Sequence, residues 1–229
     1  SQGRMLKWDL TSPSMWTHTN VVNPTTRAIR FFLDESAFSQ ANRAAELAAV
    51  RSAFAQWQAV PGTLLKFEDA GTVSGMVDIN TRDDRNVVFW SRKQSLLVNG
   101  ETVNITGATA VSFWDIFDDN NTLAEADVAI NGADYIWMTD FSNTVNQAQF
   151  VESVMLHEIG HFVGLDHSPI GAATMFVRGA NGVNLQAGLS SDDISAARAL
   201  YGQASFSATL GKISGRVTKN GAGVFGAAV

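Results

Sequence analysis

Three histidines and a glutamate are spaced so that they could hold and use a metal ion. Residues four apart lie on one face of a helix, so His157 and His161 can direct their imidazoles at one point. Gly164 allows the chain to leave the helix with a positive φ, after which His167 can return to the same point. Three neutral imidazoles suit Zn²⁺, with bonds of about 2.0–2.1 Å, and leave the fourth position open. The pattern therefore predicts a catalytic zinc site rather than a closed structural one.

Glu158 follows His157 directly, which on an ideal helix turns its side chain about 100° away from that of the histidine. It can therefore reach a water held by the metal without being a ligand itself, and we interpret it as the general base. The alternative is an amphipathic helix whose surface histidines bind nothing. The chain has only four histidines and three fall in this motif, which argues against that alternative.

The full pattern, H-E-x-x-H-x-x-G-x-x-H followed by Met175, resembles that of the metzincin metalloproteases. Ser168, directly after the third histidine, is similar to the matrixin branch, which contains the matrix metalloproteinases and their bacterial relatives. Three further stretches carry the resemblance: Glu125–Asn131, Leu189–Ile194 and Ala199–Gly202. The resemblance covers roughly residues 4–202 and is strongest from residue 125 onward.

The resemblance implies an α+β fold of the zincin type, with a twisted mixed five-stranded sheet, three helices and a horizontal active-site cleft. It implies a secreted, zinc-dependent endopeptidase that hydrolyses peptide bonds in protein or peptide substrates through a zinc-bound water activated by Glu158. His157, His161 and His167 would hold the zinc, and Met175 would form a hydrophobic base beneath it. The sequence around Thr109–Trp114 would form the upper rim of the cleft.

Two other functions stay open at this point. One is a binding module of metzincin shape that has lost activity, against which the retained Glu158 argues. The other is a zinc hydrolase that acts on a bond other than the peptide bond, which only the shared H-E-x-x-H chemistry supports.

Composition limits the partners. The formal charge of −6 over 229 residues argues against nucleic acid, and no apolar stretch is long enough to span a membrane. The absence of cysteine excludes disulfides and thiol catalysis. We expect a monomer made of a catalytic domain, residues 1–203, and a tail, residues 204–229. The Asn220-Gly221 turn predicts a β-hairpin in the tail, which resembles the start of a carboxypeptidase-regulatory-like β-sandwich.

Local patterns predict the elements that position the motif. Leu47, Val50, Phe54 and Trp57 fall at helical spacing and should pack in the core. The predicted helices are 41–60 with Ser39 as N-cap, one from about 145–149 to Gly164, and one capped by Ser190 and Asp193. The predicted strands are 27–33, 64–68, 76–80, 87–90, 109–114 and 127–130, with a hairpin turn at Asn99-Gly100.

Calcium is a second cation that the sequence admits. An oxygen-rich cluster comprises Asp115, Asp118, Asp119, Asn120 and Asn121, and Asp83 and Asp84 are similar. Many matrixins bind Ca²⁺, but a solvated turn explains the same composition.

The remaining histidine marks a departure from animal matrixins, whereas the paired aspartates are a feature that some matrixins share. Only His18 remains outside the motif, so we expect no structural zinc and an ordinary role for His18. Asp192 or Asp193 could bind a freed N-terminal ammonium, as in some matrixins, or simply stabilise the N-terminus of the last helix.

Overall fold

The computed structural model describes residues 6–11, 19–117, 122–140, 148–177, 187–209, 211 and 215–224. The strands of its main sheet are β1 (Ile29–Asp34), β2 (Phe67–Val73), β3 (Val87–Ser91), β6 (Ala110–Phe117) and β7 (Thr122–Asn131). The smaller strands are β4 (Ser95–Val98), β5 (Glu101–Asn104), β8 (Ile136–Met138), β9 (Ala148–Phe150), β10 (Thr218–Lys219) and β11 (Ala222–Gly223). The helices are α1 (Arg43–Gln58), α2 (Val151–Phe162), α3 (Ser191–Tyr201) and α4 (Ala204–Ser207).

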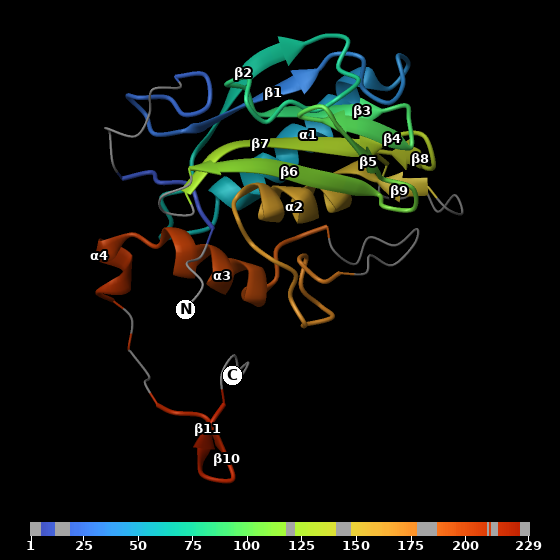
Figure 1. Ribbon diagram of the computed structural model, residues 1–229. Coiled ribbons are helices and arrows are strands. Elements are labelled where there is room, and N and C mark those ends of the chain that lie inside the picture. Colours follow the sequence, from blue (N-terminus) through green and yellow to red (C-terminus); the bar gives the residue numbers. More distant parts are fainter. Residues whose placement is uncertain are drawn as a thin grey trace.

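The main sheet is mixed and has the order β2-β1-β3-β7-β6. β6 is antiparallel to β7, whereas the other neighbours are parallel. β3 is buried along its whole length because both faces of the sheet are covered, as is usual for parallel strands. β6 lies at the edge of the sheet, directly above α2 (Figure 1). The predicted five-stranded mixed sheet is confirmed.

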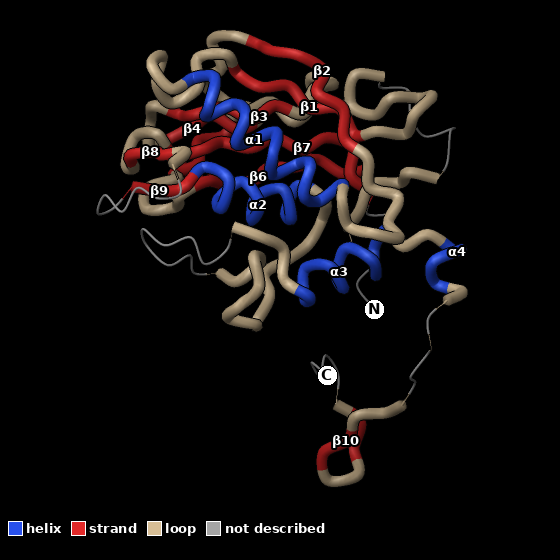
Figure 2. Tube along the Cα trace, turned by 180° about the vertical axis from the view of Figure 1, so that it is seen from behind, coloured by secondary structure: helices blue, strands red, loops and turns tan. Residues whose placement is uncertain are grey.

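α1 and α2 cover one face of the sheet together (Figure 2). The apolar stripe of α1 is buried in the main core, as its helical spacing predicted. Phe54 stacks on Phe31 of β1 with ring centroids 3.9 Å apart. Trp57 donates its indole N–H to the carbonyl oxygen of Leu156 over 2.9 Å, which ties α1 to the middle of α2. These contacts fix the helix that carries the histidines against the sheet.

The β4–β5 hairpin covers part of the opposite face. Asn99 and Gly100 both have positive φ, as a two-residue hairpin turn of this type requires, so the predicted turn is confirmed. A second apolar cluster lies between hairpin and sheet: Ile79, Phe89, Leu96, Ile105 and Ala129.

The predicted strands at 64–68 and 76–80 are wrong in position. Thr63 pairs with Gly202, and the N–H of Leu64 donates to the carbonyl oxygen of Tyr201, so the chain reaches β1 only at Phe67. In the segment 76–80 only Ile79 makes a β-bridge, to Val98. Its apolar side chain fills the second cluster and the segment does not extend the sheet.

The first two helices begin later than predicted. α1 starts after Asn42, so Ser39 is not its N-cap; the Ser39 hydroxyl accepts the N–H of Asn42, three residues on, and caps the turn before the helix. α2 starts at Val151 because Ala148–Phe150 pair with β8. The predicted capping box of α3 between Ser190 and Asp193 is confirmed.

The tail contributes a fourth helix, α4, which is a single turn beyond the three predicted. The predicted hairpin around Asn220-Gly221 is confirmed as β10–β11. It lies apart from the main sheet (Figure 1). No helix within the described ranges is long and apolar enough to cross a bilayer.

The N-terminal segment is held against α2 and α3 by one buried phenol. The Tyr201 hydroxyl accepts the N–H of Trp8 over 3.0 Å and donates to the carbonyl oxygen of Val163 over 2.7 Å. The indole N–H of Trp8 also donates to the carbonyl oxygen of Phe162. Three distant parts of the chain therefore meet at the end of α2, beside the turn that leads to His167.

We expect Tyr201→Phe to lower the free energy of unfolding by about 1–3 kcal/mol, because it removes the buried hydroxyl that bonds to two backbone groups. The matched control is Tyr135→Phe, whose hydroxyl bonds the carbonyl oxygen of Gly107 at an exposed site where water can replace it. Urea denaturation at a fixed zinc concentration measures both. Equal losses in the two variants would contradict the role given to Tyr201.

Candidate metal centre

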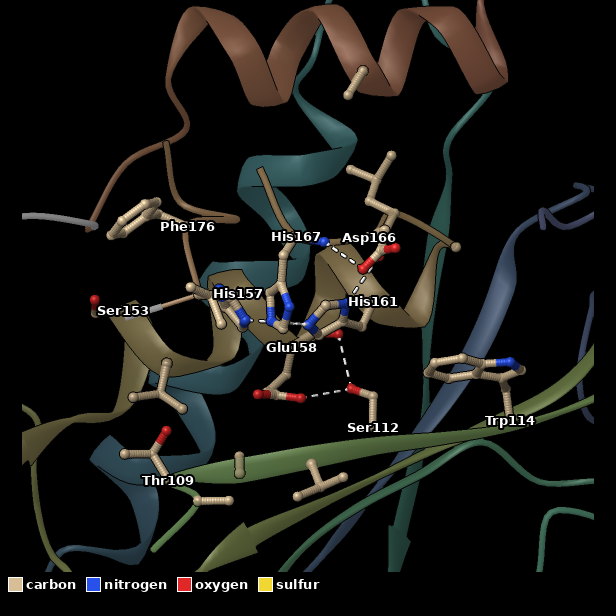
Figure 3. Close-up of a pocket in the computed structure, with 18 of the residues that line it drawn as sticks. Thr109, Ser112, Trp114, Ser153, His157, Glu158, His161, Asp166, His167 and Phe176 are labelled. Atoms are coloured by element: carbon tan, nitrogen blue, oxygen red, sulfur yellow. Dashed lines mark hydrogen bonds between the residues drawn. The ribbon is translucent and has the colours of Figure 1, made fainter. Parts of the chain in front are cut away.

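The structure brings the three histidines of the motif together. α2 places His157 and His161 one turn apart, and Gly164, with φ of +90°, turns the chain so that His167 returns to them. The Nε2 atom of His161 lies 3.1 Å from that of His157 and 3.2 Å from that of His167 (Figure 3). Among the described residues these three form the one group of histidine, cysteine and carboxylate side chains spaced to hold a metal ion.

Backbone carbonyls set the tautomers of two of these rings. The Nδ1 atom of His157 lies 2.7 Å from the carbonyl oxygen of Thr174, and that of His161 lies 2.8 Å from that of Leu165. Each Nδ1 must carry the hydrogen to make this bond, which leaves each Nε2 with a lone pair. Burial lowers the pKa of His157 to about 4 and lowers that of His161 as well, so both rings are neutral at pH 7.

This donor set fits zinc. Tetrahedral Zn–N bonds of about 2.0–2.1 Å place neighbouring nitrogens about 3.3 Å apart, close to the Nε2 separations in the structure. Two nitrogen lone pairs at 3.1 Å cannot hydrogen-bond to each other, whereas a cation between them satisfies both. Backbone oxygens that accept the Nδ1 hydrogens are the usual outer partners of zinc-binding histidines.

Met175 lies in the packed core, with only 2% of its surface exposed. Its sulfur packs directly on Gly160 of α2, where a Cβ would overlap Sδ. Only glycine fits at this position of the motif without moving the methionine. The turn that contains Met175 supports two of the histidines, because Thr174 holds His157 and the carbonyl oxygen of Met175 accepts the N–H of Ser168, beside His167.

Asp193 holds this turn in place, a role that sequence reasoning missed. Its buried carboxylate accepts the N–H groups of Thr174, Met175 and Ser190 and the hydroxyl of Ser190, at 2.7–3.0 Å. These donors contact both carboxylate oxygens, and the first five residues lie outside the described ranges, so binding of an N-terminal ammonium by Asp192 or Asp193 stays a prediction. The sequence predicted the capping box of Ser190 and Asp193, but it did not indicate that Asp193 also contacts the turn with Met175.

Glu158 lies next to the histidines and is 4% exposed. Burial raises the pKa of its carboxyl group to about 7, and a hydrogen bond from the Ser112 hydroxyl over 2.8 Å opposes part of that rise. Figure 3 shows both side chains below the imidazoles, between α2 and β6. Sequence reasoning did not identify Ser112, because its contact with Glu158 joins residues 46 positions apart.

A cleft with a volume of about 1120 Å³ opens over these groups. β6 and the segment before it line one side, and α2, the turn after Met175 and α3 line the other. Trp114 of β6 is 44% exposed on the cleft wall, and Phe176 and Val177 follow the methionine on the opposite side. The predicted position of 109–114 on the rim of the cleft agrees with this lining.

Most of the predicted oxygen-rich cluster, Asp118–Asn121, lies outside the described residues, as does His18. Asp115 is paired with Arg82 over 2.8 Å, and Asp83 with Arg85 over 2.8 Å. The N–H of Asp84 donates to the carboxylate of Glu125. Arginines thus pair with Asp115 and Asp83, and the carboxylate of Glu125 also lies beside Asp83, whose N–H it accepts over 3.3 Å.

Comparison with known protein families agrees with this site. The family model described as Matrixin matches residues 23–202, from just before β1 to the end of α3. The chain therefore belongs to the matrixin family of zinc metalloendopeptidases, and its α+β architecture is the metzincin fold. Matrixins use a catalytic zinc ion, which the group of three histidines fits. No curated protein matches the sequence.

We expect Asp193→Asn to weaken zinc binding about 10- to 100-fold, as loss of a group that supports metal ligands typically does. The amide nitrogen would face backbone N–H groups, so the turn with Thr174 could no longer hold His157 in place. The matched control is Asp192→Asn, which removes the same charge from the preceding residue of α3. Competition with a chromophoric chelator measures the zinc affinity of both variants. Equal affinities in Asp193→Asn and Asp192→Asn would contradict the role of Asp193 in supporting the turn.

Proposed function

We propose that this protein is a zinc-dependent endopeptidase in which His157, His161 and His167 bind the zinc and Glu158 is the general base. The observation that carries the proposal is the convergence of three Nε2 atoms next to a buried glutamate in an open cleft. Met175 forms the apolar floor of the site.

A zinc ion held by these histidines would supply a Lewis acid that polarises the scissile carbonyl and acidifies the attacking water. Glu158 takes the proton from that water as it attacks and then gives the proton to the departing amine. A pKa of about 7 suits both halves of this task, because the group can accept and release a proton near neutral pH. The burial of Glu158 keeps its carboxyl group away from competing bulk water.

The substrate we propose is an extended segment of a protein. β6 is an edge strand, so its free backbone groups can pair with a substrate strand while the side chains occupy pockets of the cleft. The apolar lining from Val111, Trp114, Phe176 and Val177 favours apolar substrate side chains. An unfolded protein presents such segments, and a compact one does not.

Four further points belong to this proposal. The protein acts outside the cell, as matrixins generally do. It acts as a monomer, because one chain supplies all three histidines and Glu158. Residues 1–203 form the catalytic domain and residues 204–229 a separate tail, and the family match ends at residue 202. Calcium bound by the oxygen-rich cluster that includes Asp115 is also part of the proposal.

We expect Glu158→Gln to reduce cleavage of an unfolded protein about 10²- to 10⁴-fold at equal zinc occupancy, because it removes the general base. The matched control, Glu152→Gln, makes the same change on the same helix, where an amide oxygen can still accept from Ser52 and Gln56. Mass spectrometry of the fragments reports the bonds cut, and removal of zinc by a chelator should abolish cleavage in the parent.

An inactive, fully zinc-loaded parent would favour a binding function for the cleft. Equal cleavage by the parent and Glu158→Gln would contradict the assignment of the base. Cleavage of bonds other than peptide bonds would indicate a different zinc hydrolase.

A further inference from the structure

The carboxylate of Glu158 receives one hydrogen bond from the part of the chain that the structure describes. The donor is the hydroxyl of Ser112, whose Oγ lies 2.8 Å from Oε2 of Glu158. The same Oγ lies 3.1 Å from the backbone carbonyl oxygen of Glu158. Both residues are buried, at 8% and 4% exposure, so little water is available to replace this bond.

The position of Ser112 in the sheet makes it a rigid donor. Along β6, Val111 and Phe113 face the second apolar cluster, so Ser112 between them faces α2. Its backbone pairs with Val128 of β7, a strand that is buried over almost its whole length. A serine side chain has one rotatable bond before its oxygen, whereas a glutamate has three before its carboxylate. The short, fixed side chain therefore determines where the long one points.

The two acceptors within reach of Oγ match the two states of the base during a reaction cycle. While Glu158 is ionised, the hydroxyl hydrogen of Ser112 points to Oε2. After Glu158 has taken a proton from the attacking water on its other oxygen, Oε1, the Ser112 hydrogen can stay on Oε2, which is then a carbonyl oxygen, or turn to the backbone carbonyl oxygen of Glu158. The carboxyl group keeps a partner in both states without a change in its own position.

Ser112 also lies on the strand whose edge faces the cleft. In the proposed reaction β6 aligns the substrate backbone by strand pairing, so the strand that positions the scissile bond would also position the base. Glu158 would otherwise be fixed only through α2. Because the Ser112 hydroxyl is on β6, the same strand fixes the position of Glu158 and of the substrate backbone.

We propose that Ser112 is the positioning residue for Glu158: its hydroxyl holds the carboxyl group in the orientation needed to exchange a proton with the attacking water. This inference rests on the proposed endopeptidase function. Ser112 does not touch the reacting atoms and acts only through Glu158.

The kinetic test uses the zinc-loaded protein. We expect Ser112→Ala to lower kcat about 10- to 100-fold, the effect of losing a hydrogen bond to a charged group, with KM and zinc content unchanged. The control is Ser91→Ala, which removes another buried serine hydroxyl of the sheet, bonded to the carbonyl oxygen of Lys93. It should lower stability without lowering kcat. A kcat for Ser112→Ala equal to that of the parent, or a loss in KM alone, would overturn the proposal.

A second pair of variants distinguishes the effect of the hydroxyl group from the effect of side-chain volume. Ser112→Thr and Ser112→Val introduce side chains of nearly equal size, and only threonine keeps the hydroxyl. We expect the threonine variant to retain a kcat about 10-fold or more above that of the valine variant. Equal kcat values would overturn the proposal even if both variants are less stable than the parent.

A readout independent of activity is the carboxyl ¹³C resonance of Glu158 in the zinc-loaded, ¹³C-glutamate-labelled protein, assigned by its absence in Glu158→Gln. We expect it to shift in Ser112→Ala and not in Ser91→Ala. An unshifted resonance in Ser112→Ala would overturn the proposal. Failure of the parent to cleave any protein would count against the endopeptidase function instead, and the resonance would still report whether Ser112 holds Glu158.

Discussion

The metal centre depends on one constraint: three imidazoles, two of them partly buried, must stay neutral and direct their lone pairs at a common point. Burial lowers the pKa of His157 and His161, which keeps the rings uncharged, and hydrogen bonds from Nδ1 to the carbonyl oxygens of Thr174 and Leu165 leave Nε2 as the free nitrogen. Neither effect comes from the histidines themselves. Each requires the backbone around them to be held in position.

Several distant parts of the chain provide that support. The buried carboxylate of Asp193 organises the turn that contains Met175, and this turn holds the ring of His157 and the chain beside His167. Gly160 admits the methionine against α2. The first turn of α3 is thus part of the support of the metal centre, although it lies about 25 residues after the last histidine of the motif. The sheet supports the reaction from the other side, because its edge strand lines the cleft and carries Ser112.

The spacing of residues in the sequence predicted those features of the structure that depend on residues close together in the chain. Two histidines four residues apart must share a helix face, and Gly164 has the positive φ that its place after the helix suggested. The core stripe of α1 and the Asn99-Gly100 turn follow from the same kind of short-range pattern. The strand predicted at 64–68 was displaced because Leu64 bonds to Tyr201, a partner 137 positions away that no local pattern reveals. Ser112 and Asp193 were missed as supporting residues for the same reason, since their contacts to Glu158 and to the turn at Met175 exist only after folding.

X-ray absorption spectroscopy at the zinc edge of the zinc-loaded protein tests the metal centre most directly. We expect three imidazole nitrogens and one oxygen at about 2.0–2.1 Å, the coordination of three histidines with one open position. Loss of one imidazole from the spectrum in His167→Ala would identify the third ligand. A zinc ion surrounded by oxygen alone, or a protein that binds no zinc, would contradict the central claim that these three histidines form a catalytic metal centre.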